Sequence, residues 1–313
     1  MKGVTQKILL AGLLMFIGVP LAAVLVASVA FWMLDKANGT IVSSGLTRRY
    51  LLYVPPSYDR SQAAPLVISI HPAATWPAVQ MAISRWNELA DQYGFIVVYP
   101  AGSGAFFGGL GPGPQVWPAE EDTLGRDVKF ISDLLDKLET EYHLDRNRIF
   151  VNGMSNGGGM AFLLSCELPD RIAAVGVVAG AFPSIAGHCA NAKPVPTVVF
   201  HGTADKLAPY AGGKSPVAPR PFPSVPDWTA RLARKNRCNL EPTDTRIAPD
   251  VRRLAYTDCQ ENADVVLYTL EGGGHTWPGG KQLAEWVAGR TIDDLSATKV
   301  MWEFFLRHSR GQR

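Results

Sequence analysis

The chain has 313 residues, of which 47% are hydrophobic and 19% charged, so it holds enough apolar material for a large folded core. This composition excludes a disordered chain, a collagen-like fibre and a coiled coil. The net charge is only +2, and Lys2 and Lys7 are the sole charged residues before Asp35. A nearly neutral remainder without a basic run argues against nucleic acid as a partner.

Residues 1–34 differ in composition from the rest of the chain. The segment Ile8–Leu34 contains no charged side chain. As a helix it would be ~40 Å long, which exceeds both the ~30 Å hydrocarbon core of a membrane and the usual apolar stretch of a signal peptide. We therefore expect an uncleaved signal anchor, with a signal peptide cleaved near Ala30 as the main alternative and a buried core helix as a weaker one. The two lysines favour a cytoplasmic N-terminus, so the rest of the chain is exported under both leading interpretations. The chain would contact the membrane through this segment if it is uncleaved.

Residues 40–313 alternate predicted strands and helices and are expected to form one domain. Continuous apolar runs indicate strands that are buried on both faces of a sheet. Such strands are predicted, in chain order, at 49–54, 65–70, 95–99, 148–152, 174–178, 197–201 and 265–269. Helices are predicted between or after them at 81–93, 127–142, 157–168 and 301–307, and a Pro-rich excursion at 208–226. This alternation predicts an α/β fold with a mainly parallel, doubly wound sheet and helices on both faces.

The four cysteines are Cys166, Cys189, Cys238 and Cys259. None lies in a CxxC pair, which argues against a zinc or redox site. Sequence order suggests the local bridges Cys166–Cys189 and Cys238–Cys259, one of three possible connectivities. Buried free thiols are the alternative, but an export leader favours disulfides.

The segment Gly153-Met-Ser-Asn-Gly157 is a G-x-S-x-G motif. Its context makes it informative, because a predicted strand precedes it and a predicted helix follows. In a nucleophile elbow, a strained strand-to-helix turn lifts the serine off the sheet, and the glycines allow neighbouring backbone to approach closely. Three consecutive glycines are otherwise a poor helix start. Ser155 is therefore the predicted nucleophile.

A catalytic serine requires a histidine base, which must follow it in the chain order of this arrangement. His275 lies in a glycine-rich loop directly after the predicted strand 265–269, where a catalytic side chain is expected. His201 ends a buried strand and is interpreted as a structural histidine. His308 lies on the terminal helix and is expected to face solvent.

The base in turn requires a carboxylate that orients it. Asp205 follows the predicted strand 197–201 and is the preferred candidate. The alternatives, on polar loops without that placement, are Asp227, Asp250 and Asp264.

Three segments together resemble a known family: "GMSNGG" with Ser155, "HGTAD" with Asp205 and "GGGHTWPGG" with His275. They are similar to secreted polyhydroxybutyrate depolymerase-like esterases, a group that includes feruloyl and acetylxylan esterases of carbohydrate esterase family 1. The resemblance covers about residues 45–310. It implies an α/β-hydrolase fold, no metal or organic cofactor, and two local disulfides that agree with the pairing suggested by sequence order.

The chain departs from this family at two places. The strand 65–70 is followed by His71-Pro72-Ala73, whereas the family usually has His-Gly there. Pro72 has no N–H, so the first oxyanion donor is expected from the backbone of Ala73 or a neighbour, and the second from Asn156. Arg126-Asp127 stands where the family tends to have paired aspartates, which is expected to alter packing rather than chemistry.

The motifs predict an exported serine esterase that forms an acyl-enzyme on Ser155 and acts on hydroxyalkanoate, feruloyl or acetyl esters. Trp277, next to His275, and Trp117 are predicted to line the substrate cleft. The alternatives are a serine peptidase of prolyl-oligopeptidase type and a catalytically silent, membrane-tethered binding protein on the same scaffold.

Overall fold

The computed structural model describes residues 36–105, 115–117, 121–185, 187 and 189–310. Residues 1–34, for which an anchor or a cleavable signal is predicted, lie outside the described residues. Within the described ranges, no helix is both long enough and apolar enough to cross a membrane.

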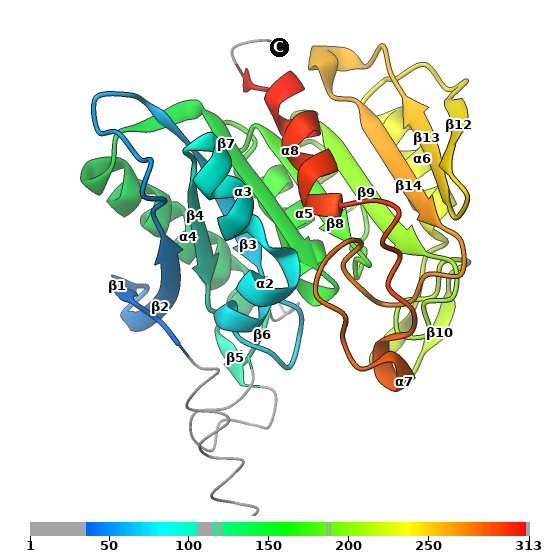
Figure 1. Ribbon diagram of the computed structural model, residues 1–313, viewed down its shortest axis with the longest axis horizontal. Coiled ribbons are helices and arrows are strands. Elements are labelled where there is room, and N and C mark those ends of the chain that lie inside the picture. The colour runs from blue at the N-terminus through cyan, green and yellow to red at the C-terminus, as the bar shows by residue number, and fades with distance from the viewer. Residues whose placement is uncertain (1–35, 106–114, 118–120, 186, 188, 311–313) are drawn as a thin grey trace, which may run out of the picture.

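A ten-stranded mixed sheet forms the centre of the fold (Figure 1). Its strands in spatial order are β1 (Gly39–Ser43), β2 (Leu46–Tyr53), β4 (Ile96–Pro100), β3 (Ala64–Ile70), β7 (Leu144–Met154), β8 (Ala174–Val178), β9 (Thr197–Gly202), β14 (Val265–Leu270), β13 (Val251–Tyr256) and β12 (Thr243–Ala248). The strands from β4 to β14 in this order run parallel, and antiparallel strands complete both edges. The predicted α/β class with a mainly parallel sheet is confirmed.

Helices cover both faces of the sheet (Figure 1). One layer consists of α2 (Pro77–Ser84), α3 (Trp86–Tyr93) and α8 (Ala297–Arg307), and the other of α4 (Glu121–Glu141), α5 (Asn156–Glu167) and α6 (Val225–Lys235). Successive residues of a strand point to opposite faces. Leu66 and Ile68 therefore pack under one layer and Val67 under the other, which explains why the buried strands are continuous apolar runs.

The predicted helix at 81–93 is two helices. Arg85 has a left-handed backbone, with φ 58° and ψ 27°, and this ends α2 and begins α3. A left-handed residue cannot continue a right-handed helix. Gly94 ends α3 in the left-handed conformation, with φ 73°, as is common for a glycine that follows the last turn of a helix.

Among the described residues, six shorter elements lie in the segments that connect the main strands and helices. They are β5 (Gly104–Ala105), β6 (Gln115–Val116), β10 (Gly213–Ser215), β11 (Ala218–Phe222), η1 (Gln260–Asn262) and α7 (Glu285–Ala288). The Pro-rich excursion forms the β10–β11 hairpin and then enters α6.

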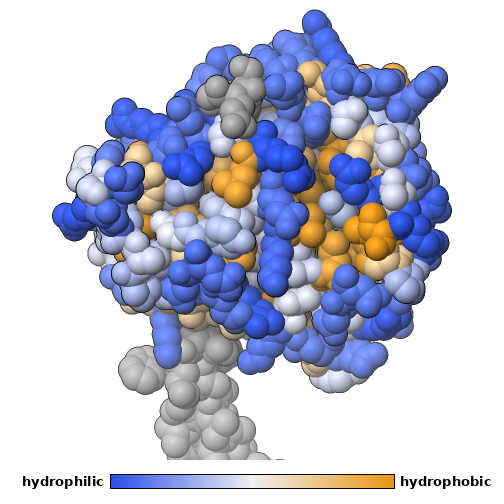
Figure 2. All heavy atoms as spheres, turned by 45° about the horizontal axis from the view of Figure 1, so that its top comes forward, coloured by the Kyte–Doolittle hydropathy of each residue, from blue (hydrophilic) through white to orange (hydrophobic). Residues whose placement is uncertain are grey.

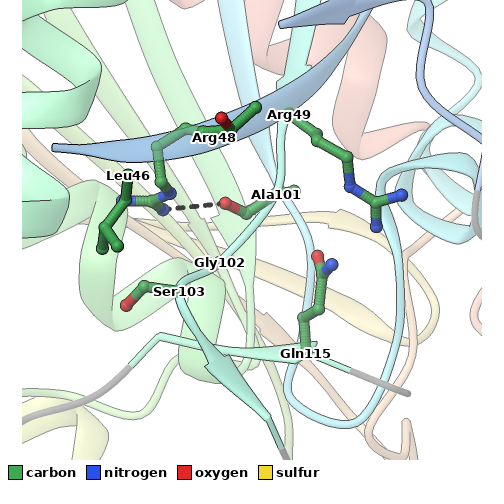
Figure 3. A pocket seen from close by; sticks show the side chains of 8 residues that line it. Leu46, Arg48, Arg49, Ala101, Gly102, Ser103 and Gln115 are labelled. Carbon is green, nitrogen blue, oxygen red and sulfur yellow. Dashed lines mark hydrogen bonds between the residues drawn. The ribbon is translucent and has the colours of Figure 1, made fainter. Parts of the chain in front are cut away.

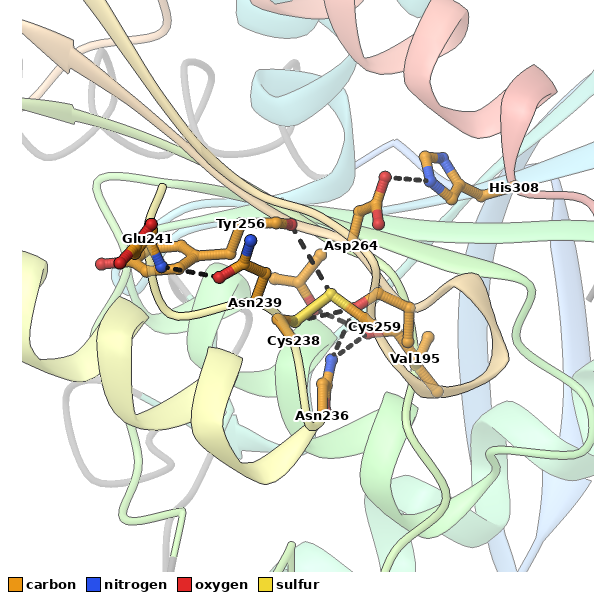
Figure 4. The surroundings of a disulfide bond; sticks show 11 residues. Val195, Asn236, Cys238, Asn239, Glu241, Tyr256, Cys259, Asp264 and His308 are labelled. Atoms are coloured by element: carbon orange, nitrogen blue, oxygen red, sulfur yellow. Dashed lines mark hydrogen bonds and ion pairs between the residues drawn. A yellow bond between two sulfur atoms is a disulfide. The ribbon is translucent and has the colours of Figure 1, made fainter. Parts of the chain in front are cut away.

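Both predicted disulfides, Cys166–Cys189 and Cys238–Cys259, are present. The second joins the end of α6 to the segment before β14, beside the contact between His308 and Asp264 (Figure 4). His308 is 7% exposed, and its Nδ1 donates to the Phe304 carbonyl at 2.8 Å. The expectation that His308 faces solvent is therefore wrong, because the side chain bonds the Phe304 carbonyl and packs beside Asp264. Disulfides persist in oxidising compartments, so this pairing indicates maturation outside the reducing cytoplasm.

Figure 2 shows one face of the molecule, which is largely hydrophilic, with apolar patches between the polar side chains. Isolated apolar side chains on a surface are ordinary, and the large buried aromatic residues lie instead between the sheet and its helices.

Candidate functional site

Ser155 occupies the sharp turn between β7 and α5. Its backbone has φ 56° and ψ −122°, a conformation that is rare for a residue with a side chain. The turn is held by backbone hydrogen bonds, since the Ser155 amide donates to Val178 O at 2.9 Å and its carbonyl accepts from Gly159 and Ala181. Such strain at a strand-to-helix turn is the geometry expected of a nucleophile elbow.

The glycines of the motif allow close backbone contacts. A Cβ atom on Gly153 would lie 2.3 Å from the Gly157 carbonyl oxygen, and one on Gly157 would lie 2.4 Å from the Ile70 carbonyl oxygen. Both distances are far below van der Waals contact. Only glycine fits at these positions, which confirms the packing reason inferred from the sequence.

The structure joins Asp205 and His275 directly. Their parent strands β9 and β14 are parallel neighbours, with Gly202 paired to Leu270 at their carboxyl ends. The loops that follow bring His275 Nδ1 to 2.7 Å from Asp205 Oδ2. The His275 backbone is anchored separately, since its amide donates to the Ala288 carbonyl.

Asp205 is buried and fully hydrogen-bonded. Its Oδ1 accepts the backbone amides of Leu207 and Ala208, each at 2.8 Å. Burial alone would raise the pKa of Asp205, but the contacts with His201 and His275 outweigh it and hold the pKa well below its usual range. The carboxylate therefore stays ionised. His201 Nε2 lies 3.3 Å from Asp205 Oδ2, a neighbour that the sequence interpretation treated only as structural.

Ser155 follows the carboxyl end of β7, and Asp205 and His275 follow the carboxyl ends of β9 and β14. All three residues therefore lie at the same end of the parallel strands, and β8 lies between β7 and β9. In the described part of the chain, no hydrogen bond joins Ser155 to His275. Asp227, Asp250 and Asp264, the alternative acids, are not bonded to His275; Asp250 pairs with Arg290 and Asp264 with His308.

The loop after β3 presents a single peptide plane next to the elbow. Pro72 O accepts hydrogen bonds from His71 Nδ1 at 2.8 Å and from the Thr75 hydroxyl at 2.7 Å. A trans peptide is planar, so its C=O and the following N–H point in opposite directions. Fixing the Pro72 carbonyl therefore fixes the direction of the Ala73 N–H.

The amides near this plane differ in their availability. The Ala74 N–H donates to Gln115 O at 2.8 Å, whereas the Ala73 N–H has no acceptor among the described residues. Asn156 is the first residue of α5, and the first amides of a helix have no intrahelical acceptor. The two amides expected as oxyanion donors, Ala73 and Asn156, are thus both without an acceptor among the described residues.

His71 and Trp117 brace this loop. Burial lowers the pKa of His71 to about 4, although its hydrogen bond to Pro72 acts in the opposite direction, so the ring is neutral and its Nε2 accepts from the Gly102 amide. Trp117 Nε1 donates to His71 O, and the Asn156 side chain bonds both the amide and the carbonyl of Trp117. Sequence reasoning missed this role of His71 because Gly102 and Trp117, which join the loop to the rest of the site, lie 31 and 46 residues away in the chain.

The two tryptophans predicted for the cleft are both buried. Trp117 is 2% exposed and Trp277 is 1% exposed. Trp277 Nε1 donates to the Thr298 hydroxyl at 2.9 Å, so its ring packs between its loop and α8. A role for either ring in lining a cleft stays a prediction.

A cavity of about 270 Å³ lies beside β2 and the segment that follows β4 (Figure 3). It is lined by the start of β2, by Ala101–Ser103 and by Gln115. Arg48 reaches across it to the Ala101 carbonyl and to buried Asp127. Asp127, at the second departure from the family pattern, thus ties α4 to β2, as the expected packing role requires.

Comparison with known proteins is consistent with this geometry. Feruloyl esterase B of Piromyces equi is 30% identical over 249 residues, which are 75% of this chain and 44% of that protein. Feruloyl esterase D of Neurospora crassa is 27% identical over 281 residues, 86% of each chain. This chain thus spans less than half of the Piromyces protein and most of the Neurospora one.

Solved structures show the same fold. A CE1 ferulic acid esterase from Anaeromyces mucronatus aligns with a TM-score of 0.54 and 16% identity, over 89% of this chain and 92% of that one. An acetyl xylan esterase from Aspergillus awamori aligns with a TM-score of 0.52 and 18% identity, over 73% and 89%. Residues 48–227, more than half of the chain, match the family described as Esterase PHB depolymerase. The chain therefore belongs to the esterase PHB depolymerase family of carboxylic ester hydrolases.

Proposed function

We propose that this protein hydrolyses esters with Ser155 as nucleophile, His275 as general base and Asp205 as the carboxylate that orients the base. The hydrogen bond of 2.7 Å between His275 Nδ1 and Asp205 Oδ2 carries this proposal. An ionised carboxylate only accepts hydrogen bonds, so Nδ1 carries the hydrogen. The Nε2 lone pair then remains available for the serine proton.

The steps follow from this protonation state. His275 Nε2 takes the hydroxyl proton of Ser155 as Oγ attacks the ester carbonyl, and the imidazolium then gives that proton to the departing alcohol. Water, deprotonated by the same nitrogen, attacks the acyl-enzyme, and the proton returns to Oγ as the acid leaves. The Ser155–His275 hydrogen bond is expected to tighten when substrate binds, as is common for catalytic contacts.

The oxyanion is assigned to the backbone amides of Ala73 and Asn156. Neither amide has an acceptor in the described part of the chain, and the hydrogen bonds to Pro72 O restrain the Ala73 amide in direction. Loss of one such donor typically costs ~3–4 kcal/mol in the transition state. Pro72 therefore removes one amide from this loop without removing the oxyanion site.

For the substrate, we propose feruloyl or acetyl esters of sugar hydroxyls, with hydroxyalkanoate esters as the further family chemistry. The support is the names of similar proteins, which include feruloyl esterases and a bifunctional acetylxylan esterase/xylanase from Neocallimastix patriciarum. A panel of methyl ferulate, acetylated xylan and a hydroxybutyrate oligomer tests this choice. Hydrolysis of a peptide anilide in place of all three esters would contradict it and favour the peptidase alternative.

We further propose that the catalytic part is exported and stays attached to the membrane through residues 1–34. The uncharged segment Ile8–Leu34 and the two disulfides support this proposal. Mass spectrometry of the mature N-terminus is expected to find Met1 in the detergent-soluble membrane fraction. A start near Phe31 in the soluble exported fraction would instead show a cleaved signal peptide.

A further inference from the structure

His201 is a buried histidine that contacts Asp205, the acid of the proposed triad, and the turn that follows Asp205. It belongs to β9 and is 1% exposed. Its Nε2 lies 2.7 Å from the carbonyl oxygen of Ala208 and 3.3 Å from Asp205 Oδ2. A carbonyl oxygen only accepts, so Nε2 carries the hydrogen and presents it to the Ala208 carbonyl, with the carboxylate close by.

This contact closes the turn that holds Asp205. The Ala208 amide donates to Asp205 Oδ1, and the Ala208 carbonyl is held by His201. Asp205 Oδ1 thus accepts two hydrogen bonds from this turn, one from the Ala208 amide and one from the Leu207 amide. The other oxygen, Oδ2, is left for His275 and is the one nearest to the His201 N–H.

The chemistry of His201 argues against a purely packing role. Its Nδ1 is buried and has no hydrogen-bond partner among the described residues. A buried polar atom without a partner costs stability that a hydrocarbon ring of the same shape would avoid. The Phe182 and Tyr210 rings lie within 5.7 Å and 6.1 Å of the imidazole, so an aromatic hydrocarbon would suit these surroundings.

We infer that His201 is a positioning residue that orients Asp205 toward His275, an inference that rests on the proposed function. Besides Asp205 and His275, the titratable group next to it is Tyr210. Without the His201 N–H, the 205–208 turn loses its anchor and Oδ2 loses a nearby positive dipole. The Asp205 carboxylate then becomes more basic, and His275 holds its proton more strongly because a more basic carboxylate stabilises the imidazolium better. The carboxylate is also less well placed to orient His275.

The test compares three variants of the full chain in ester hydrolysis. His201→Phe keeps the ring and removes the donor, whereas His201→Gln places an amide N–H near the position of Nε2. His308→Phe is the matched control, because His308 is also buried, also bonds a backbone carbonyl and also lies 3.3 Å from an aspartate, Asp264. Asp264 directly precedes β14, whereas His275 follows it, so the two residues lie at opposite ends of that strand.

We expect His201→Phe to lower kcat by about 10- to 100-fold with little change in KM, less than the ~10⁴-fold loss known when a triad histidine takes the wrong tautomer. Its acid limb in the pH profile of kcat/KM should move to higher pH. The downfield proton resonance of His275 Nδ1–H should broaden or shift. His201→Gln should restore most of kcat, and His308→Phe should lower the melting temperature without moving the pH profile.

Two results would overturn the inference: a folded His201→Phe with kcat within twofold of wild type, or a folded His201→Gln as impaired as His201→Phe. Neither result would touch the proposed function, which Ser155→Ala tests in the same assay. If Ser155→Ala kept full activity, the proposed function would fail first.

Discussion

At the scale of single residues, some polar atoms of the site are already hydrogen-bonded within the protein, and others are left to interact with substrate. Asp205 uses Oδ1 for two backbone amides and Oδ2 for His275. The Ala74 amide is paired with Gln115, whereas that of Ala73 is not. Nucleophilic attack needs a free base and free oxyanion donors, and this pattern of pairing leaves such groups available.

Substitutions in the proposed triad should act as a unit. Ser155→Ala and His275→Ala are each expected to lower kcat for a p-nitrophenyl ester by roughly 10³-fold or more, and the double variant should be little worse than either. Asp205→Asn should also lower kcat while the protein stays folded by circular dichroism. A Ser155→Ala variant with more than about a tenth of wild-type kcat would show that another residue is the nucleophile.

The Thr75 hydroxyl should contribute to catalysis through the Pro72 carbonyl. Thr75→Val removes one of the two donors to Pro72 O, so the Ala73 amide is less restrained and kcat should fall by about fivefold to twentyfold, a fraction of a whole oxyanion donor. Thr140→Val is the matched control, because that hydroxyl bonds a backbone carbonyl within α4. Equal kinetics for both variants would remove Thr75 from the account of the oxyanion site.

The residues that sequence could identify are those carried by local patterns. Ser155 stands out because its glycines and flanking elements are contiguous, and His275 because its loop follows a strand. The contacts of His71, Trp117 and His201 could not be predicted, because they join segments that the sequence does not place together. Trp117 was expected only in the cleft, and His201 only as a structural histidine. The burial of Trp277, which lies in a loop, depends likewise on Thr298 of α8.

At the scale of elements, burial decides which strands the sequence reveals. The central strands β3, β4, β8 and β9 are buried along their length, and their apolar runs predicted them closely. The edge strand β12 is mostly exposed, with the polar sequence TDTRIA, and gives no such signal. The break at Arg85 was also not predictable, because a left-handed arginine leaves no mark on the apolar spacing.

The two disulfides should stabilise the elements that they join. They close loops with sequence separations of 23 and 21 residues, for which the chain-entropy model gives ~3 kcal/mol each. Reduction should therefore lower the melting temperature in differential scanning calorimetry, and Cys238→Ser/Cys259→Ser should reproduce part of that change under oxidising conditions. An unchanged melting temperature after complete reduction would contradict this expectation.

At the scale of the whole molecule, stability should depend on pH through buried His71. The pKa of this group is 6.5 in an unfolded chain and about 4 here, so below pH 6.5 the unfolded state binds a proton that the folded state does not. The free energy of unfolding should thus fall between pH 6.5 and 4, by as much as about 3 kcal/mol from this group. Asp205, whose pKa is depressed below 3.8, adds stability that is lost only at still lower pH.

Chemical denaturation at several pH values measures this dependence. His71→Asn keeps a donor near Nδ1 but cannot titrate, so its unfolding free energy should vary less between pH 6.5 and 4 than that of wild type. His143→Asn, at an exposed histidine that also contacts a backbone carbonyl, is the control and should behave as wild type. If wild type and His71→Asn showed the same slope, His71 would not be the group responsible.

The central claim is that ester hydrolysis proceeds through a covalent bond to Ser155. Treatment of the full chain with a fluorophosphonate, followed by peptide mass spectrometry and a parallel ester assay, tests it most directly. We predict one adduct, on the Ser155 hydroxyl, with loss of activity in proportion to labelling and with no labelling of Ser155→Ala. An adduct on a different residue, or full ester hydrolysis by a completely labelled protein, would contradict the account.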